Sequence, residues 1–326
     1  MRKTVLSLAG LGALLVPLLP AGSAQATSTK TWVSAATGSD ANPCSLINPC
    51  QTFIGALAKT SPGGAIGVLS PGEYGALLIT KAVNISNDGV GEAGVQFGGV
   101  AIEIMTNAGD VVSLRGLVID GALTGNAGIR LDGALAALHV QNCVIKNFEG
   151  SGGIGNWGLL YAPSVTSQLF VSDTIVLNNG SVANSGGILM LPQGGNGFHA
   201  VLDRVHLENN VIGLKVDHKF ATSGSGVVVR DSVSSGNAGD GINISVPSGM
   251  PGAIVLIERS ASVDNAGTGI LASGVHAVAL VSDSTMTRNG AGVSAVGGGQ
   301  LISYGNNRNN NNLGPEGTAT SMLAPF

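Results

Sequence analysis

Short apolar stretches recur along the chain, each followed by polar and glycine-rich positions. The clearest copies align without gaps at 169–174, 227–232, 255–260 and 279–284. Each copy is rich in Val, Leu or Ile and ends in a charged residue followed by Ser or Thr. Stretches of this length, separated by Gly and Asn, are typical of β-strands joined by tight turns. The hydrophobic pattern therefore predicts a chain built from repeated short strands.

An Asn follows each copy at a fixed distance, six positions after the charged residue, as from Asp173 to Asn179. In the last copy the same offset runs from Tyr304 to Asn310. The resulting Asn column contains Asn179, Asn210, Asn237, Asn265, Asn289 and Asn310. Asn tolerates the left-handed backbone conformation of a sharp turn, and stacked amides can hydrogen-bond between coils. We expect a structural function for this column.

A Gly followed by an aliphatic residue comes next in most copies, and earlier copies start at Gly128-Ile129 and Gly153-Ile154. The interval between copies ranges from 23 residues (Ile270 to Val293) to 34 residues (154 to 188). Such a repeat cannot bury its own apolar side chains, but stacked repeats can. The frame of leucine-rich repeats is absent. The predicted fold is all-β, a single-stranded right-handed parallel β-helix (a solenoid) with a short N-terminal cap helix.

The ends of the chain differ from the repeats. Arg2 and Lys3 precede an apolar run, and Ala24-Gln25-Ala26 supplies a small-x-small cleavage site, as in an export signal. The segment 49–58 has apolar residues at helical spacing, which predicts the cap helix.

These patterns divide the chain into four parts. They are a signal peptide (1–26), an N-terminal cap region (27–64), the β-helix (65–312) and a C-terminal tail or cap (313–326). The apolar run of the signal is short for a membrane span. We therefore expect a secreted protein, periplasmic or extracellular, with no membrane span after cleavage.

The composition of the chain bears on its binding partners and on the state of its cysteines. Charged residues make up 10% of the chain, with 15 basic against 19 acidic and no basic run, which argues against nucleic acid as a partner. Cys44 and Cys50 lie in a Pro-rich loop and are expected to form a disulfide in an oxidising compartment. Cys143 falls in a column of small residues, where we expect a packed thiol.

Charged residues of the repeats form two neighbouring columns. One contains Asp203, Arg230 and Glu258, and the other contains Asp173, Arg204, Asp231, Arg259 and Asp283. The sign of the charge alternates at every coil in both columns. In-register stacking favours such alternation, because opposite charges attract and like charges repel. We interpret the columns as structural ladders.

A second set of polar residues lies in the strands that open with Gly and an aliphatic residue. Alternate positions there point outward, and the candidates for catalysis are Glu103, Asp132, Lys215, Asp217 and His218. Those for carbohydrate binding are Arg130, Trp157, Tyr161 and Asn243. Aromatic rings beside charged groups would make a groove for a sugar chain.

The spacing of the carboxylates argues against hydrolysis. A hydrolase needs two carboxylates about 5–5.5 Å or 6.5–9.5 Å apart. Asp132 and Asp217 lie three coils apart, or about 14 Å. Glu103 and Asp132 would be roughly 8 Å apart from strand geometry, but Arg130 stacks against Glu103 and makes a salt bridge the simpler interpretation.

Segments near the N-terminus resemble the cap region of secreted pectin-lyase-like proteins. They are 32–34, 38–44 (Gly-Ser-Asp-Ala-Asn-Pro-Cys), 52–57 and 70–74. The run 112–121 is similar to coils of bacterial proteins with right-handed β-helix repeats. The resemblance spans nearly the whole mature chain and implies the fold. It does not imply one activity, because the superfamily holds lyases, hydrolases, epimerases and adhesins.

Signatures of the enzymes in that superfamily are missing. The Asn-Thr-Asp, Asp-Asp, Gly-His-Gly and Arg-Ile-Lys motifs of polygalacturonase-like hydrolases do not occur, nor does the Arg-x-Pro-x-x-Arg segment of pectate lyases. The five histidines show no metal-ligand spacing, so we expect no metal and no cofactor; Ca²⁺ enters only under a lyase alternative.

The sequence is compatible with two functions. The first is a noncatalytic module that binds carbohydrate or a surface, or serves as a structural protein, with a polysaccharide or cell-surface glycan as partner. The alternative is a polysaccharide lyase or glycoside hydrolase with a divergent site on the outer face. The oligomeric state is not predicted.

Overall fold

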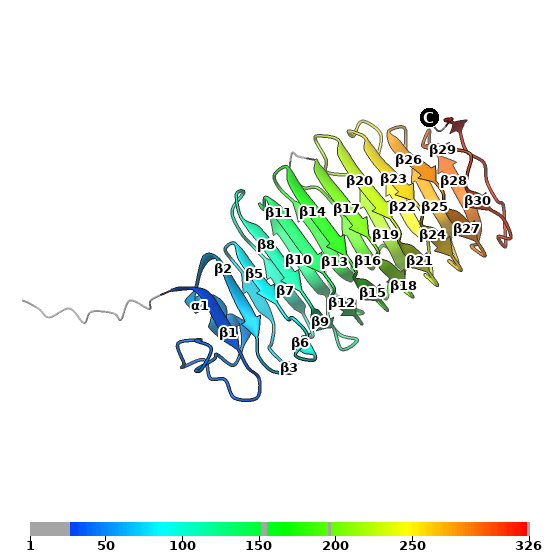
Figure 1. The fold of residues 1–326 in the computed structure, drawn as a ribbon. Helices are drawn as coiled ribbons and strands as arrows, with labels where there is room; N and C mark the ends of the chain where they lie inside the picture. The colour runs from blue at the N-terminus through cyan, green and yellow to red at the C-terminus, as the bar shows by residue number, and fades with distance from the viewer. Residues whose placement is uncertain (1–26, 151–154, 195–196, 325–326) are drawn as a thin grey trace, which may run out of the picture.

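The computed structural model describes residues 27–150, 155–194 and 197–324, and these form a right-handed parallel β-helix. The coils stack along one axis, and each complete coil adds one strand to each of three parallel sheets (Figure 1). The predicted signal peptide lies outside the described residues. No helix in the described part of the chain is long and apolar enough to cross a membrane.

The three sheets are named in the order in which the chain visits them. Sheet 1 contains β1 (Ser28–Val33), β2 (Thr60–Val68), β5 (Val83–Ser86), β8 (Val111–Arg115), β11 (Ala137–Gln141), β14 (Ser167–Ser172), β17 (Phe198–Asp203), β20 (Ser225–Arg230), β23 (Ala253–Glu258), β26 (Ala277–Ser282), β29 (Gln300–Ser303) and β31 (Ser321–Met322). Sheet 2 contains β3 (Gly72–Glu73), β6 (Ala93–Gln96), β9 (Leu117–Asp120), β12 (Val144–Lys146), β15 (Ile175–Leu177), β18 (His206–Glu208), β21 (Val233–Ser235), β24 (Ala261–Val263), β27 (Thr285–Thr287) and β30 (Arg308–Asn309). Sheet 3 contains β4 (Leu77–Ile79), β7 (Val100–Ile104), β10 (Ala127–Gly133), β13 (Trp157–Pro163), β16 (Gly186–Met190), β19 (Ile212–Asp217), β22 (Ile242–Ser245), β25 (Thr268–Ser273) and β28 (Ala291–Val296).

The core is a set of stacked apolar columns inside the coils. Val229, Ile257 and Val281 are register partners on successive strands of sheet 1, and all three are buried. Because neighbouring strands lie about 4.8 Å apart, each buried side chain contacts its equivalents above and below. A single coil has no such neighbours, which is why the core exists only in the stack.

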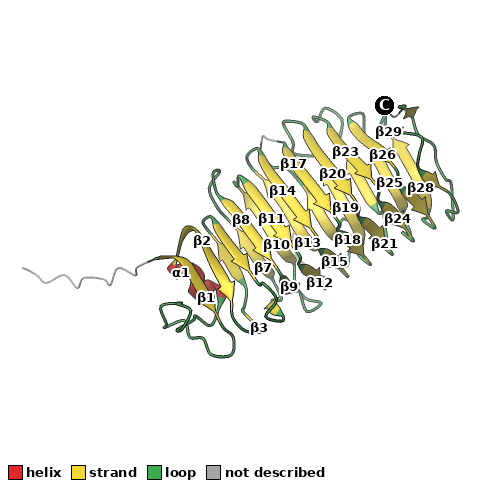
Figure 2. Ribbon diagram, in the orientation of Figure 1, coloured by secondary structure: helices red, strands yellow, loops and turns green. Residues whose placement is uncertain are grey.

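One helix, α1 (Phe53–Lys59), occurs among the described residues, in the segment for which a cap helix was predicted (Figure 2). The Thr52 side chain accepts a hydrogen bond from the Gly55 N–H and so satisfies a free donor of the first turn. Phe53 and Leu57 are buried in the same core as the first coils. The function of α1 as a cap stays a prediction.

The Asn column forms a buried hydrogen-bonded ladder at the turn between sheets 2 and 3. The Asn237 Nδ2 donates to the Asn265 Oδ1 at 2.7 Å, and the Asn265 Nδ2 donates to the Asn289 Oδ1 at 2.8 Å. Each side-chain oxygen also accepts from the backbone N–H of the ladder residue one coil earlier, as Asn265 does from Asn237 at 3.2 Å. The amides thus occupy backbone groups that a tight turn would otherwise leave unpaired.

The left-handed backbone conformation was predicted for the Asn column, but other residues adopt it. None of the five ladder residues from Asn179 to Asn289 has a positive φ; the residue before each does, as Asn209 (φ 53°) and Asp264 (φ 58°) show. The turn between sheets 1 and 2 also has left-handed residues, and these are the charged column: Asp173, Arg204, Asp231, Arg259 and Asp283, with φ from 45° to 55°. The ladder Asn is therefore required for its amide and not for its backbone.

Two register assignments from the sequence are wrong. Asn310 is not in the ladder: Asn312 accepts from the N–H and the Nδ2 of Asn289. On sheet 3, Ile129 is paired with Leu159, so that coil starts at Gly158-Leu159. The predicted start at 153–154 lies outside the described residues.

Candidate functional site

A cavity of about 180 Å³ opens on the outer face of sheet 3, where β13, β16 and β19 are neighbours. We call it the sheet 3 cleft. Its lining consists of Trp157, Asn184, Leu189, Leu191, Lys215, Asp217 and Lys219. Two ammonium groups and one carboxylate therefore share a small concave surface.

Strand β19 supplies the charged wall of the cleft. Its side chains alternate, with Leu214 and Val216 buried in the core and Lys215 and Asp217 on the outer side. The Lys215 and Asp217 side chains are only 13% and 10% exposed, because they lie in the cleft and not on its rim. Lys219 follows the strand and is 44% exposed.

These groups form one polar network. The Lys215 Nζ donates to the Asn184 Oδ1 at 2.9 Å and lies 3.5 Å from the Asp217 Oδ2. The Lys219 Nζ lies 3.9 Å from the same oxygen, and the Lys219 N–H donates to the Asp217 Oδ1 at 3.1 Å. One carboxylate thus fixes two lysines, and the network carries one positive charge in excess.

An apolar wall faces this network. Leu160, Ala162, Leu189 and Leu191 are buried although they occupy outward positions of their strands, and they pack with Trp157 in a cluster separate from the core. Register places Leu189 directly beside Lys215. A cleft with one apolar and one charged wall suits an amphipathic ligand such as a sugar ring with an acidic group.

The predicted aromatic platform is wrong, because neither ring offers an exposed face. Tyr161 points inward as the register partner of Leu131 and Met190, and its hydroxyl is hydrogen-bonded to Ser167. Burial raises the pKa of Tyr161 far above its usual range. Trp157 is 0% exposed and belongs to the apolar wall.

His218 is also misplaced by the sequence prediction. It is fully buried on the inner side of the chain, with its Nδ1 3.0 Å from the Pro251 carbonyl oxygen and its ring 6.1 Å from that of Phe198. Its Nε2 is buried without a hydrogen-bond partner among the described residues. His218 therefore does not reach the cleft and cannot act there as an acid or base.

The buried His218 makes stability depend on pH. Desolvation lowers the pKa of His218 below the value of about 6.5 that it has in the unfolded chain. Above pH 6.5 His218 is neutral in both states and does not affect the free energy of unfolding. Below pH 6.5 the imidazole binds a proton in the unfolded state but not in the folded state, so the free energy of unfolding decreases as the pH falls. We expect His218→Phe to reduce this loss, by up to about 1.4 kcal/mol per pH unit. Denaturant unfolding between pH 7 and 5 measures it.

Exposed His276 provides the control for that measurement. His276→Phe makes the same substitution at an exposed position, so the difference in pH slope between the two variants isolates the effect of the buried ring. Equal pH slopes for the unmodified protein and His218→Phe would show that the buried ring takes no part.

The other predicted site residues lie outside the cleft. Arg130 donates to the Glu103 Oε1 at 3.0 Å on the neighbouring coil, and Asp132 is exposed beyond them. Three coils separate Asp132 on β10 from Asp217 on β19, or about 14 Å. Asn243, the register partner of Lys215, donates to the Asp240 Oδ2 at 2.6 Å.

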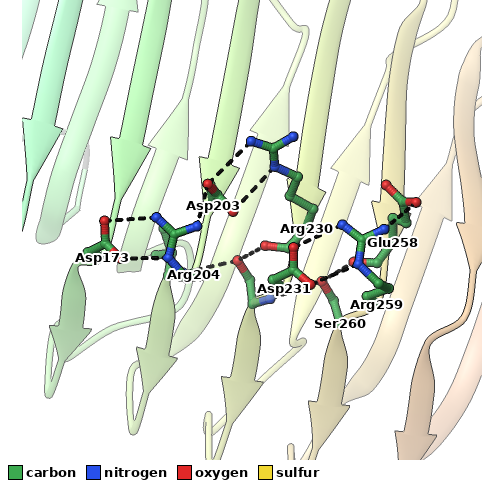
Figure 3. Close-up of polar contacts among 10 residues, drawn as sticks. Asp173, Asp203, Arg204, Arg230, Asp231, Glu258, Arg259 and Ser260 are labelled. Atoms are coloured by element: carbon green, nitrogen blue, oxygen red, sulfur yellow. Dashed lines mark hydrogen bonds and ion pairs between the residues drawn. The ribbon is translucent and has the colours of Figure 1, made fainter.

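The charged columns form ion-pair ladders along the turn after sheet 1 (Figure 3). Arg204 is paired with Asp173 at 2.6 Å and with Asp203 at 2.7 Å, and Arg259 is paired with Asp231 at 2.9 Å. The hydrogen bonds from Arg204 hold the pKa of Asp173 below its usual range. Solvent screens these exposed pairs, so each contributes little to stability, and none of these residues lines the cleft.

The three cysteines lie away from the cleft. Cys44 and Cys50 form a disulfide in the loop before α1. Cys143 is a buried free thiol, and burial raises its pKa to about 11, which keeps it protonated and unreactive.

Sequence reasoning missed four residues of the cleft: Asn184, Leu189, Leu191 and Lys219. A signal for one of them was available, because the aligned copies Gly187-Ile188 and Gly213-Leu214 place Leu189 beside Lys215. Asn184 and Lys219 lie in loops before β16 and after β19, and no repeat pattern positions a loop.

The cleft is poor in acidic side chains. Asp217 is the only carboxylate among its described lining residues. No group of three or more His, Cys, Asp and Glu side chains with metal-ligand geometry occurs in the described part of the chain. The residues present therefore do not fit the calcium ion of a calcium-dependent lyase.

The fold is similar to that of solved carbohydrate-active enzymes. A crystal structure of pectate lyase Pel9A superposes with a TM-score of 0.62 and 16% identity, covering 93% of this chain and 80% of that chain. A GH136 lacto-N-biosidase from Eubacterium ramulus (TM-score 0.46, 12% identity, 90% and 67% covered) and a rhamnogalacturonan lyase (TM-score 0.39, 12% identity, 84% and 75% covered) are more distant. No protein-family model and no curated protein sequence matches the chain. The chain therefore shares the parallel β-helix fold of that pectate lyase.

Proposed function

We propose that this protein is exported and binds an acidic polysaccharide in the sheet 3 cleft without cleaving it. The carrying observation is the pair Lys215 and Lys219 around the single carboxylate of Asp217, opposite an apolar wall. A uronate ring offers a carboxylate to the ammonium groups and an apolar ring face to Leu189. Charge-assisted hydrogen bonds of this type are about twice as strong as neutral ones.

The size of the cleft indicates how a polysaccharide is held. Its volume of about 180 Å³ is below the roughly 300–1,000 Å³ of sites that enclose a small molecule. It suits one residue of a longer chain, with the rest lying along the outer face of sheet 3. Arg130 and Asn243 lie on β10 and β22, on either side of the cleft strands, and are the flanking contacts of this proposal.

Two further observations support an exported polysaccharide-binding protein. Residues 1–26 have the pattern of an export signal. The fold is shared with a pectate lyase, whose named substrate is an acidic polysaccharide. Binding without cleavage is supported by the single carboxylate among the described lining residues, because hydrolysis uses two.

Binding to polygalacturonate oligomers tests the proposal, with neutral galactan as the comparison. Lys215→Ala and Lys219→Ala should each raise the Kd for polygalacturonate by about 10- to 100-fold, the loss of one charged hydrogen bond. Lys146→Ala is the matched control: it is also paired with an aspartate, Asp120 at 3.4 Å, but lies on sheet 2. Isothermal titration calorimetry gives the constants.

Asp217→Asn has an expected effect of opposite sign. It removes the carboxylate that occupies both lysines, so the affinity for polygalacturonate should increase, and more at low salt than at high salt. Equal affinity for galactan and polygalacturonate would contradict the proposal. Release of unsaturated uronate, followed by ultraviolet absorbance and lost in Lys215→Ala, would establish the lyase alternative instead.

A further inference from the structure

Sheet 1 has an apolar stripe on its outer face. Six successive strands, β14 to β29, place an apolar side chain at the same outward register position: Phe170, Val201, Val228, Leu256, Leu280 and Ile302. Ile254 and Val278 stack beside the stripe on β23 and β26, and Ile254 is 49% exposed. No described segment lies over these strands (Figure 1).

This face differs from the other outward faces of the molecule. On sheet 3 the corresponding outward column mixes polar and apolar side chains, in the order Glu103, Arg130, Leu160, Leu189, Lys215 and Asn243. On sheet 1 the column is apolar in all six strands, and the centres of β14 to β26 are apolar runs, from Leu169–Val171 in β14 to Ala277–Val281 in β26. Such runs are typical of strands that are covered on both faces, and an exposed apolar patch marks an interaction site.

We propose that a second copy of this chain covers the stripe in a twofold symmetric dimer. The axis lies in the plane of the interface, along the strand direction, midway between β20 and β23. Rotation about it reverses the order of the coils and keeps each outward column opposite itself. Val228 then faces the partner's Leu256, Val201 faces the partner's Leu280, and Phe170 faces the partner's Ile302.

Charge complementarity supports this axis. The column next to the stripe contains Asp203, Arg230 and Glu258 in register on β17, β20 and β23 (Figure 3). The centre of the six-residue stripe coincides with the midpoint between Arg230 and Glu258. Arg230 therefore faces the partner's Glu258 on both sides of the axis, and Asp203 faces the partner's Ser282. No like charges of this column meet.

The area of the face matches what a stable dimer requires. Six coils at about 4.8 Å extend roughly 29 Å, and three outward columns at about 6.6 Å cover roughly 20 Å. The face therefore offers about 600 Å² on each partner. Both partners together bury about 1,200 Å², within the range of specific interfaces. Sheet 3 and its cleft remain open to a ligand in this dimer.

Sedimentation equilibrium of the purified protein tests the dimer. The unmodified protein should be dimeric, and Val228→Lys, which places a charge at the centre of the stripe, should raise the dimer Kd by at least about 100-fold. Val233→Lys is the matched control, because Val233 is an outward valine of the same coil on sheet 2. It should leave the Kd unchanged, and circular dichroism checks that both variants fold.

A charge exchange tests the position of the axis. Arg230→Glu should weaken the dimer by bringing two carboxylates together, and adding Glu258→Arg should restore it by recreating the pair with the signs reversed. A monomeric unmodified protein at about 100 μM, or a dimer that survives Val228→Lys, overturns the proposal. A dimer that Arg230→Glu weakens but the double variant does not restore overturns the assigned axis.

Discussion

Replacing Asn237 by Leu is expected to lower the free energy of unfolding by about 3–5 kcal/mol. The Asn237 Oδ1 accepts from the Asn210 N–H at 2.9 Å, and its Nδ2 donates to the Leu207 carbonyl oxygen at 3.2 Å. Leucine has a similar size but no polar atoms, so two buried backbone groups lose their partners. Each such group costs about 1–3 kcal/mol. Denaturant unfolding followed by circular dichroism measures the loss.

Asn209 lies one coil earlier, at the turn position just before the ladder, and provides the control. It is exposed, has a φ of 53°, and Gly adopts that conformation without strain. Asn209→Gly should change the unfolding free energy by about 0.5 kcal/mol or less. If Asn237→Leu were as mild, the ladder amides would not be needed to satisfy the turn.

The fold could be predicted from the sequence because stacking imposes the same requirements on the equivalent positions of every coil. A column such as Val229, Ile257 and Val281 must be apolar to form the core, and a charged column must alternate in sign to stack. Both requirements are visible without coordinates. The same holds for the column of Ser232, Ser260 and Ser284. The N–H groups of Ser232 and Ser260 each donate to the serine hydroxyl one coil later, and the N–H of Ser284 donates to the Asn307 Oδ1.

The last ladder residue was misassigned because its reference point was wrong. The six-residue offset was counted from Tyr304, but Asn306 occupies the turn position that follows Asp283: its Oδ1 accepts from the Asp283 N–H at 3.0 Å. Six positions after Asn306 is Asn312, the observed ladder residue. The rule was correct, but one extra residue lies between β29 and the turn of the final coil and shifts the turn position to Asn306.

The candidate site could be predicted only in part. Lys215 and Asp217 follow from strand alternation, because the coil around them was aligned correctly. The sequence predicts an outward Tyr161 because Gly and Ile at 153–154 match the start of a coil, five residues before the start that the register shows at Gly158-Leu159. Where side chains alternate, an odd shift exchanges the inner and outer faces. Loop residues such as Lys219 carry no periodic signal at all.

Gly274→Ala is expected to destabilise the protein by about 4 kcal/mol. Gly274 has a φ of 102°, which costs an Ala about 1–2 kcal/mol in strain. A Cβ there would also lie 1.8 Å from the Val246 carbonyl oxygen, a backbone atom. Relief is difficult because the turn is held on both sides: the Gly274 N–H donates to the Val296 carbonyl, and its own carbonyl accepts from Ala277.

Gly249 separates the clash from the strain. Its φ is 81°, so an Ala there would have a similar backbone strain, but its Cβ would have no other atom within 4 Å. Gly249→Ala should therefore cost about 1 kcal/mol, and the difference between the two variants in denaturant unfolding gives the energy of the clash. Hydrogen exchange should show the excess loss of protection in the coils around β26 and β29, since solenoid coils open locally. Equal losses for the two variants would mean that the turn at Gly274 moves freely and that the close approach to Val246 does not constrain the final coils.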